Sequence, residues 1–191
     1  MRKIFVCFCL FFANCYCVFA SDKMNVEFYK CIDGDTAKFI INGDIKTVRF
    51  LSINAPEVDH NGNNSEPFGN EARDYTCNLL SSASVIEIQY DPKSDKKDKY
   101  DRLLAWIFVD GELLQEKLVS KGLSEVKYVY DDYMYSNKLY DLENIAKEKG
   151  VGMWYNNNND SYYLLGLSSI LIVIFISILF ILFKKKRLYF L

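Results

Sequence analysis

Residues 47–58 read TVRFLSINAPEV, a hydrophobic strand that contains an arginine and ends in Asn-Ala-Pro-Glu. An unpaired guanidinium in an apolar interior would cost several kcal/mol, so Arg49 must find an anion. That anion is either a structural carboxylate or a ligand phosphate, which the planar guanidinium can hold through two hydrogen bonds. The expected face of Arg49 also carries three other side chains: Thr47, Leu51 and Ile53.

The end of this stretch gathers groups of different charge. Pro56 cannot donate a ladder hydrogen bond, so the strand stops before Glu57. We therefore expect the oxygens of Asp35 and Asn54, the carboxylate of Glu57 and the cation of Arg49 near one strand end.

Asp35 belongs to the sequence DGDT at residues 33–36, which has two readings. Asp-Gly is ordinary hairpin-turn chemistry, and that reading alone explains the motif. A calcium loop of the helix-loop-helix type is excluded, because acids at alternate positions and a distant glutamate are absent.

A second arginine, Arg102, follows a polar run and begins the next expected strand. Two arginines, a carboxylate base and a site for a hard cation are what phosphodiester hydrolysis requires. Cations neutralise the charge that grows on phosphorus, while the carboxylate takes a proton from the attacking water.

Hydrophobic periodicity and turn residues predict an α+β domain that is mainly β, with helices on the sheet. Five strands are expected at 24–32, 37–41, 47–53, 84–90 and 103–109. Three helices are expected at 65–83, with Ser65 as a possible cap, at 112–122 and at 135–150. The polar run 91–101 is expected to be a mobile loop. The pattern indicates a closed five-stranded barrel with three packed helices, occupying residues 21–155.

Both ends of the chain are strongly apolar. Residues 1–20 have the pattern of a secretory signal peptide, with an uncleaved membrane anchor as the alternative. After a polar linker at 156–161, the uncharged segment 162–183 is long enough to cross a bilayer as a helix. The basic tail at 184–191 places the domain on the opposite, extracytoplasmic side: a cell surface, a periplasm or a secretory lumen.

Charge and cysteine content restrict the function further. Without the six cations of the two end segments, 17 Lys and Arg face 25 Asp and Glu, a net charge of −8. Capture of nucleic acid therefore depends on a local basic surface. Only Cys31 and Cys77 lie outside the signal peptide, and we expect two separate thiols, although one bridge fits an oxidising compartment. The single histidine, His60, makes a zinc site improbable.

Six ordered blocks give the sequence a family resemblance: DGDT, VRFLSINAPE, FGNEARDYT, DKYDRLLAWIF, YVY and GVGMW. In order and spacing they resemble the thermonuclease family, whose members carry staphylococcal nuclease-like domains, over about residues 25–155. The resemblance implies an oligonucleotide-binding-type barrel (OB-fold) with three helices. It also implies calcium-dependent cleavage of DNA and RNA.

The same resemblance implies a role for each matching position. Asp35 and Asn54 would be side-chain ligands of Ca²⁺, and Ala55 would supply a backbone carbonyl. Glu57 would be the general base or the group that positions the attacking water, with Arg49 and Arg102 clamping the phosphate. The remaining matches are residues for substrate binding, of which the last would face a base: Lys99, Tyr100, Tyr128 and Tyr130.

Three departures from the family pattern bear on this reading. Asn54 replaces a metal-binding carboxylate and so loses a charge, which is one lever on calcium affinity. Asp101 replaces a glycine before Arg102, where it could compete for the guanidinium. The domain is also acidic, which weakens non-specific capture of nucleic acid.

We therefore expect a membrane-tethered, outward-facing, calcium-dependent nuclease of low sequence specificity. Its substrates would be DNA and RNA, preferably single-stranded. Its C-terminal helix would contact membrane lipid, and no protein partner is inferred. The alternative is a catalytically inactive OB-fold module that binds nucleic acid or protein. A third hypothesis, a surface adhesion protein, would make the presence of the matching catalytic residues a coincidence.

Overall fold

The computed structural model describes residues 23–59, 65–155, 171–172 and 174–176. The predicted signal peptide, linker and basic tail lie outside these residues. So does the predicted membrane span at 162–183, apart from short helical pieces at 171–172 and 174–176. Within the described ranges, no helix has the length and hydropathy needed to cross a membrane.

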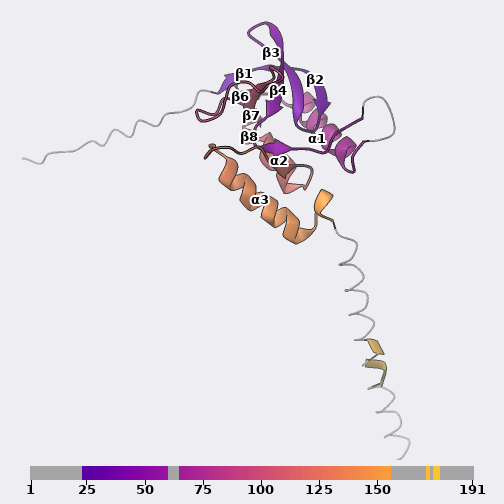
Figure 1. Ribbon diagram of the computed structural model, residues 1–191. Helices are drawn as coiled ribbons and strands as arrows, with labels where there is room; N and C mark the ends of the chain where they lie inside the picture. The colour runs from indigo at the N-terminus through magenta and orange to yellow at the C-terminus, as the bar shows by residue number, and fades with distance from the viewer. Residues whose placement is uncertain (1–22, 60–64, 156–170, 173, 177–191) are drawn as a thin grey trace, which may run out of the picture.

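Seven strands form one sheet, which occupies the upper part of Figure 1. They are β1 (Met24–Asn25), β2 (Glu27–Asp33), β3 (Thr36–Ile41), β4 (Asp44–Phe50), β6 (Ile86–Gln89), β7 (Leu103–Val109) and β8 (Glu112–Leu113). Their order is β1-β6-β7-β4-β3-β2, with β8 paired to β7. The pairing of β4 with β7 is parallel, and the other pairings of this sheet are antiparallel.

The two edges of this order, β1 and β2, are consecutive in the chain and are separated only by Val26. The N–H of Val26 donates to the carbonyl of Ile86 at 3.0 Å, so the chain passes here from its β6 partner to its β3 partner. No ladder among the described strands joins β1 to β2. The predicted closed five-stranded barrel is therefore corrected. Seven strands form this sheet, and its order stays open between β1 and β2, because the chain changes partner at Val26 and the two strands do not pair with each other.

The expected strand at 47–53 breaks in its middle. β4 ends at Phe50, and Ser52 has a φ of 60°, which turns the chain. Residues Ile53–Asn54 then form β5, which pairs with β9 (Glu125–Val126) in a separate two-stranded sheet. Arg49 and Asn54 consequently stand on two different sheets.

The three predicted helices are present as α1 (Gly69–Ser82), α2 (Leu114–Ser120) and α3 (Ser136–Lys149), followed by a 3₁₀ turn η1 (Gly152–Trp154). Ser65 does not cap α1, because its hydroxyl accepts the N–H of Asp59 at 3.1 Å. The predicted start of the second helix is also corrected, because the Asp110-Gly111 turn returns residues 112–113 to the sheet as β8.

The core lies between the sheet and the helices. α1 packs against β2, and α2 packs against both β7 and α3 (Figure 1). The fully buried Gln115 of α2 joins helix to sheet, because its amide accepts from the N–H of Ile107 and donates to the carbonyl of Ala105. The largest buried apolar side chains are Trp106, Phe39, Phe50, Ile53, Leu80 and Ile88.

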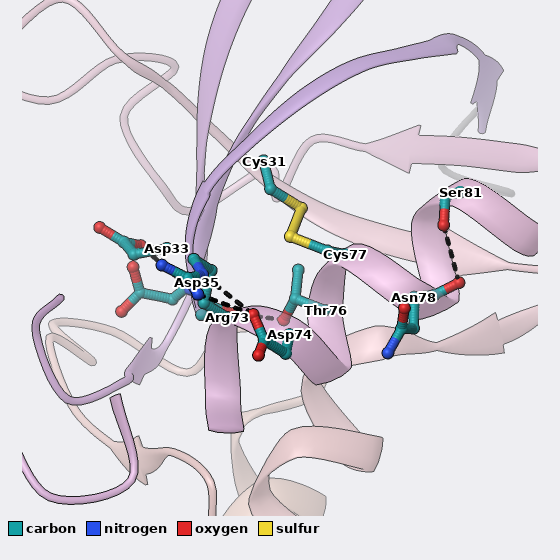
Figure 2. The surroundings of a disulfide bond; sticks show 10 residues. Cys31, Asp33, Asp35, Arg73, Asp74, Thr76, Cys77, Asn78 and Ser81 are labelled. Carbon is teal, nitrogen blue, oxygen red and sulfur yellow. Dashed lines mark hydrogen bonds and ion pairs between the residues drawn. A yellow bond between two sulfur atoms is a disulfide. The ribbon is translucent and has the colours of Figure 1, made fainter. Parts of the chain in front are cut away.

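Cys31 of β2 and Cys77 of α1 form a disulfide, with a Cα–Cα distance of 5.6 Å (Figure 2). The expectation of two separate thiols is therefore wrong, because the packing of α1 on β2 brings the two cysteines within bonding reach. Beside the bridge, the hydroxyl of Thr76 donates to the carbonyl of Gly34 at 2.7 Å. A Cβ at Gly34 would lie 2.6 Å from the Cβ of Ala55, so only glycine allows the backbone to approach Ala55 this closely.

The polar run 91–101 is held by hydrogen bonds near both of its ends. Near its C-terminal end, Lys97 forms a β-bridge with Leu103. At its start, the carboxylate of Asp91 accepts from the indole N–H of Trp106 at 3.0 Å and from the N–H of Met134 at 2.8 Å. Asp91 is buried and thus joins this run, strand β7 and the chain that leads into α3.

Removal of the disulfide should destabilise the fold. The bridge closes a loop with a sequence separation of 46, so Cys31→Ser/Cys77→Ser should lower the free energy of unfolding by about 3–4 kcal/mol. Denaturant titration of the oxidised full-length protein measures this change. Reduced wild-type protein should unfold at the same denaturant concentration as the double variant, and a transition unaffected by reductant would contradict the bridge.

Asp91→Ala should lower the free energy of unfolding by about 2–4 kcal/mol, because three N–H donors, those of Lys93, Trp106 and Met134, lose a buried acceptor. Asp95→Ala, an exposed acid of the same run, is the matched control and should change it by less than about 0.5 kcal/mol. Equal denaturation midpoints for the two variants would show that Asp91 does not anchor this run.

Candidate functional site

A single cleft of about 640 Å³ collects nine of the ten predicted site residues. Its walls come from the turn after β2, from β4 and β5, from the run 91–102 and from the segment after β9. The nine residues are Asp35, Arg49, Asn54, Glu57, Lys99, Tyr100, Arg102, Tyr128 and Tyr130. Another cavity, of about 750 Å³, lies beside the disulfide and contains none of them.

Asp35 and Arg49 form a buried ion pair at the base of the cleft. Nη1 of Arg49 lies 2.6 Å from Oδ2 of Asp35, and the two residues are only 8% and 4% exposed. The anion that the sequence required for Arg49 is therefore a carboxylate of the protein in this structure. The same Oδ2 accepts the N–H of Ala55 at 2.7 Å, and Oδ1 accepts the hydroxyl of Thr36 at 3.0 Å.

Burial raises the pKa of Asp35 to about 7. The positive charge of Arg49 and the N–H of Ala55 oppose this rise, while the neighbouring carboxylate of Asp33 adds to it. Asp33 also accepts the backbone N–H of Asp35 at 3.3 Å and lines the same cleft. The turn at residues 33–36 thus brings two carboxylates close together, and one of them, that of Asp35, pairs with the Arg49 guanidinium.

Asn54 completes this arrangement from the other sheet. Its Oδ1 accepts from Nη2 of Arg49 at 3.1 Å, and its Nδ2 donates to Oε1 of Glu125 at 3.3 Å. The oxygens of Asp35 and Asn54 therefore converge on one cationic group. This convergence of hard oxygen donors fits a calcium ion, which takes carboxylate, amide and carbonyl oxygens together with water.

The carboxylates of the cleft do not by themselves form a metal-binding site. Among the described residues, no three His, Cys, Asp or Glu side chains form a group that could hold a metal ion. Ala55 is buried and does not line the cleft, and its N–H faces Asp35. The predicted role of its carbonyl stays a prediction.

Glu57 is exposed at the rim of the cleft. Its backbone is clamped to Glu66, because its N–H donates to the Glu66 carboxylate at 2.9 Å and its carbonyl accepts the Glu66 N–H at 3.0 Å. Gly69 lies against that carbonyl, since a Cβ at Gly69 would approach it to 2.7 Å. Within the described part of the chain, no hydrogen bond engages the Glu57 carboxylate, which faces solvent with its backbone fixed.

Parallel pairing of β4 and β7 brings the second arginine to the cleft, because Val48 pairs with Leu103, the residue after Arg102. Nε of Arg102 donates to the carboxylate of Asp98 at 2.7 Å. Burial raises the pKa of Asp98, but hydrogen bonds from Arg102 and Tyr100 outweigh it and hold this pKa below its usual value.

Asp101 does not compete for Arg102 in this structure, because it pairs instead with Lys97 at 2.6 Å. Its φ of 63° lies in the left-handed region, which favours glycine, the residue that the family resemblance implies at this position.

The exposed rim is aromatic and basic. The ring of Tyr100 lies 4.9 Å from Nζ of Lys99 and 5.4 Å from Cζ of Arg102. Across the cleft, the ring of Tyr128 lies 5.9 Å from Cζ of Arg49. Tyr128 and Tyr130 are 49% and 81% exposed, which leaves ring surface open to solvent.

Sequence reasoning gave no role to two acidic residues that line the cleft, Asp33 and Asp98, or to Glu125, which contacts the cleft residue Asn54. Asp98 had a local signal, because it stands four residues before Arg102. Glu125 had none, because it meets Asn54 only through the pairing of β5 with β9, which are distant in sequence.

The chain is similar in sequence to several known proteins. Residues 47–156, more than half of the chain, match the family model described as "Staphylococcal nuclease homologue". The chain is 36% identical over 137 residues to the SPbeta prophage-derived endonuclease YokF of Bacillus subtilis (strain 168), covering 71% of this chain and 46% of the relative. It is 37% identical over 132 residues to Endonuclease YncB of the same organism, covering 69% and 62%.

A third relative is the Thermonuclease of Staphylococcus hyicus, 27% identical over 136 residues, with 71% of this chain and 79% of the relative covered. The chain therefore spans less than two thirds of the length of the two Bacillus relatives and most of the staphylococcal one. By the extent of the model match, this chain belongs to the staphylococcal nuclease homologue family.

Proposed function

We propose that the protein is a calcium-dependent nuclease that hydrolyses phosphodiester bonds of DNA and RNA with low sequence specificity. The observation that carries this proposal is the single cleft that contains an exposed carboxylate, two arginines and converging oxygen ligands. Relatives named as endonucleases and a thermonuclease support the same reaction class.

Glu57 has the geometry of a general base. Its carboxylate is exposed at the rim, while its backbone is fixed by Glu66. A solvated carboxylate can accept a proton from a water molecule as that water attacks phosphorus. Close packing of Gly69 against the Glu57 carbonyl keeps this base at one position relative to the arginines.

Arg49 and Arg102 each retain donors for a phosphate. A guanidinium has five N–H groups, and Arg102 uses its Nε for Asp98, which leaves both terminal nitrogens for phosphate oxygens. Arg49 donates to the carboxylate and the backbone carbonyl of Asp35 and to the amide oxygen of Asn54, which leaves two of its five N–H groups. Two cations on adjacent strands can thus stabilise the charge that develops at phosphorus.

The calcium ligands in this proposal are Asp35, Asn54 and the carbonyl of Ala55. When bound there, calcium would supply a Lewis acid that polarises a phosphate oxygen. The oxygens of Asp35 and Asn54 are already held in place by Arg49, Thr36 and the N–H of Ala55. The chain therefore keeps this charged site assembled around Arg49.

The rim residues Lys99, Tyr100, Tyr128 and Tyr130 would bind the substrate. Exposed tyrosine rings stack on bases of any sequence, which favours single strands over stacked duplexes. Lysine and arginine beside the rings offset the acidic net charge locally. Hydrogen-bond readout of base edges is not needed, which accords with low sequence specificity.

We also infer an extracytoplasmic location, with attachment to a membrane through residues 162–183. The signal-peptide pattern and the apolar segment support this inference from sequence. The Cys31–Cys77 bridge supports it from chemistry, because structural disulfides persist in oxidising compartments.

Glu57→Gln and Arg102→Ala should each lower the rate of calcium-dependent cleavage by about 10²–10⁴-fold, because one removes the base and the other a phosphate clamp. The measurement is cleavage of labelled single-stranded DNA by full-length protein in millimolar calcium and in chelator. Matched controls are Glu148→Gln and Arg73→Ala, exposed or half-exposed helix residues that do not line the cleft.

One result would count against an enzyme, and another would count against the role of Glu57. If wild-type protein binds DNA but cleaves none in calcium, the remaining interpretation is the catalytically inactive binding module. Glu57→Gln as active as Glu148→Gln would remove Glu57 from the chemistry.

Tyr130→Ala should weaken binding of single-stranded DNA by about 1–3 kcal/mol, because an exposed stacking surface is lost. Fluorescence anisotropy in the Glu57→Gln background, where cleavage is suppressed, measures the dissociation constant. Tyr29→Ala removes a comparably exposed ring on β2 and should leave the dissociation constant unchanged. Equal affinities for the two variants would argue against stacking at Tyr130.

A further inference from the structure

Glu125 stands directly opposite Asn54 in the two-stranded sheet formed by β5 and β9. Its Oε1 accepts a hydrogen bond from Nδ2 of Asn54 at 3.3 Å. Its side chain is about one-third exposed, at 33%, and also pairs with Lys127 at 2.7 Å. A carboxylate thus lies one hydrogen bond behind a predicted calcium ligand.

Contacts at both ends fix the orientation of the Asn54 amide. Arg49 donates to Oδ1, and Glu125 accepts from Nδ2. A reversed amide would set its N–H groups against the guanidinium and its oxygen against a carboxylate, and both contacts would be repulsive. Asn54 therefore presents its oxygen toward Asp35 and Arg49.

The backbone that carries Glu125 is itself held. The buried carboxylate of Glu143 on α3 accepts the N–H of Val126 at 2.8 Å. The N–H of Lys127 donates to the carbonyl of Ser52 at 3.0 Å. Both anchors lie on the two residues that directly follow Glu125, so the backbone that carries its carboxylate is held by the fold.

We propose that Glu125 is a positioning residue of the predicted calcium site: it orients the Asn54 oxygen and supplies behind it the negative charge that the neutral amide lacks. This inference rests on the proposed function for the identity of the metal. It also explains the asparagine, because an aspartate at position 54 would face the Glu125 carboxylate across paired strands. Hydrogen-bonded groups behind a metal ligand commonly change metal affinity by about 10–100-fold.

The two residues should therefore behave as a coupled pair. Asn54→Asp alone should bind a cation no more tightly than wild type, because repulsion from Glu125 cancels the added ligand charge. Asn54→Asp/Glu125→Gln should bind more tightly than either single variant, because the glutamine amide can donate to the new carboxylate.

Terbium binding to full-length protein tests the proposal without any assay of cleavage. The probe is Tb³⁺ luminescence excited through the tyrosines of the cleft, with displacement by Ca²⁺. Glu125→Ala should raise the terbium dissociation constant about tenfold, while Glu125→Gln, which keeps an oxygen acceptor, should raise it by less. Glu27→Ala, an exposed glutamate six residues from Asp33 along β2, should leave it unchanged.

The inference is overturned if Glu125→Ala binds terbium like wild type, or if wild type binds no terbium that calcium displaces. If Glu125→Ala fails to fold, the proposal stands or falls on the order of affinities among Asn54→Asp, Glu125→Gln and their combination. Cleavage assayed in parallel separates the two proposals. Inactive wild type with the predicted terbium affinities defeats only the nuclease, and active wild type with unchanged affinities defeats only Glu125.

Discussion

The ion pair between Arg49 and Asp35 is the interaction on which the rest of the site depends. Both groups are buried, and a guanidinium or a carboxylate left alone there would cost several kcal/mol. The pair joins β4 to the turn after β2, and Asn54 extends it to the second sheet. Three elements that are separate in the fold therefore share one cation.

The residues around that ion pair fix the turn at 33–36 in place, but they do not fix the rim of the cleft. Gly34 packs against Ala55 and Ala72 at distances that exclude any side chain, and Thr76 holds its carbonyl beside the disulfide. By contrast, the groups that would meet a substrate are exposed and carried by loops: Glu57, Lys99, Tyr100 and Tyr130. The floor of the cleft is rigid and charged, while its rim is open and aromatic. This arrangement suits the proposed binding of phosphate at fixed positions and of nucleobases by stacking.

Much of this arrangement could be predicted from the sequence. The burial of Arg49 required an anion, the Asp33-Gly34 turn located the hairpin of β2 and β3, and the spacing of apolar residues located the helices. Nine of the ten proposed site residues meet in one cleft because they lie on, or close in sequence to, strands that pair: β3 with β4, β4 with β7 and β5 with β9.

The parts that escaped prediction are set by contacts between distant segments. Nothing near Ser52 indicated that the chain would turn there and leave the sheet, because that turn serves the pairing of β5 with β9. The same pairing brings Glu125 to Asn54. The bridge between Cys31 and Cys77 depends on the docking of α1 on β2, and the interrupted barrel depends on a change of partner at Val26.

The central claim is that the buried cation and its oxygen partners form the phosphate and calcium site of a nuclease. A crystal structure of the Glu57→Gln protein with calcium and a single-stranded oligonucleotide tests it most directly. The account predicts calcium on Asp35 and the Asn54 oxygen, with one phosphate held by Arg49 and Arg102. Calcium bound elsewhere, or an oligonucleotide on another face while Arg49 keeps its bonds to Asp35 and Asn54, would contradict it.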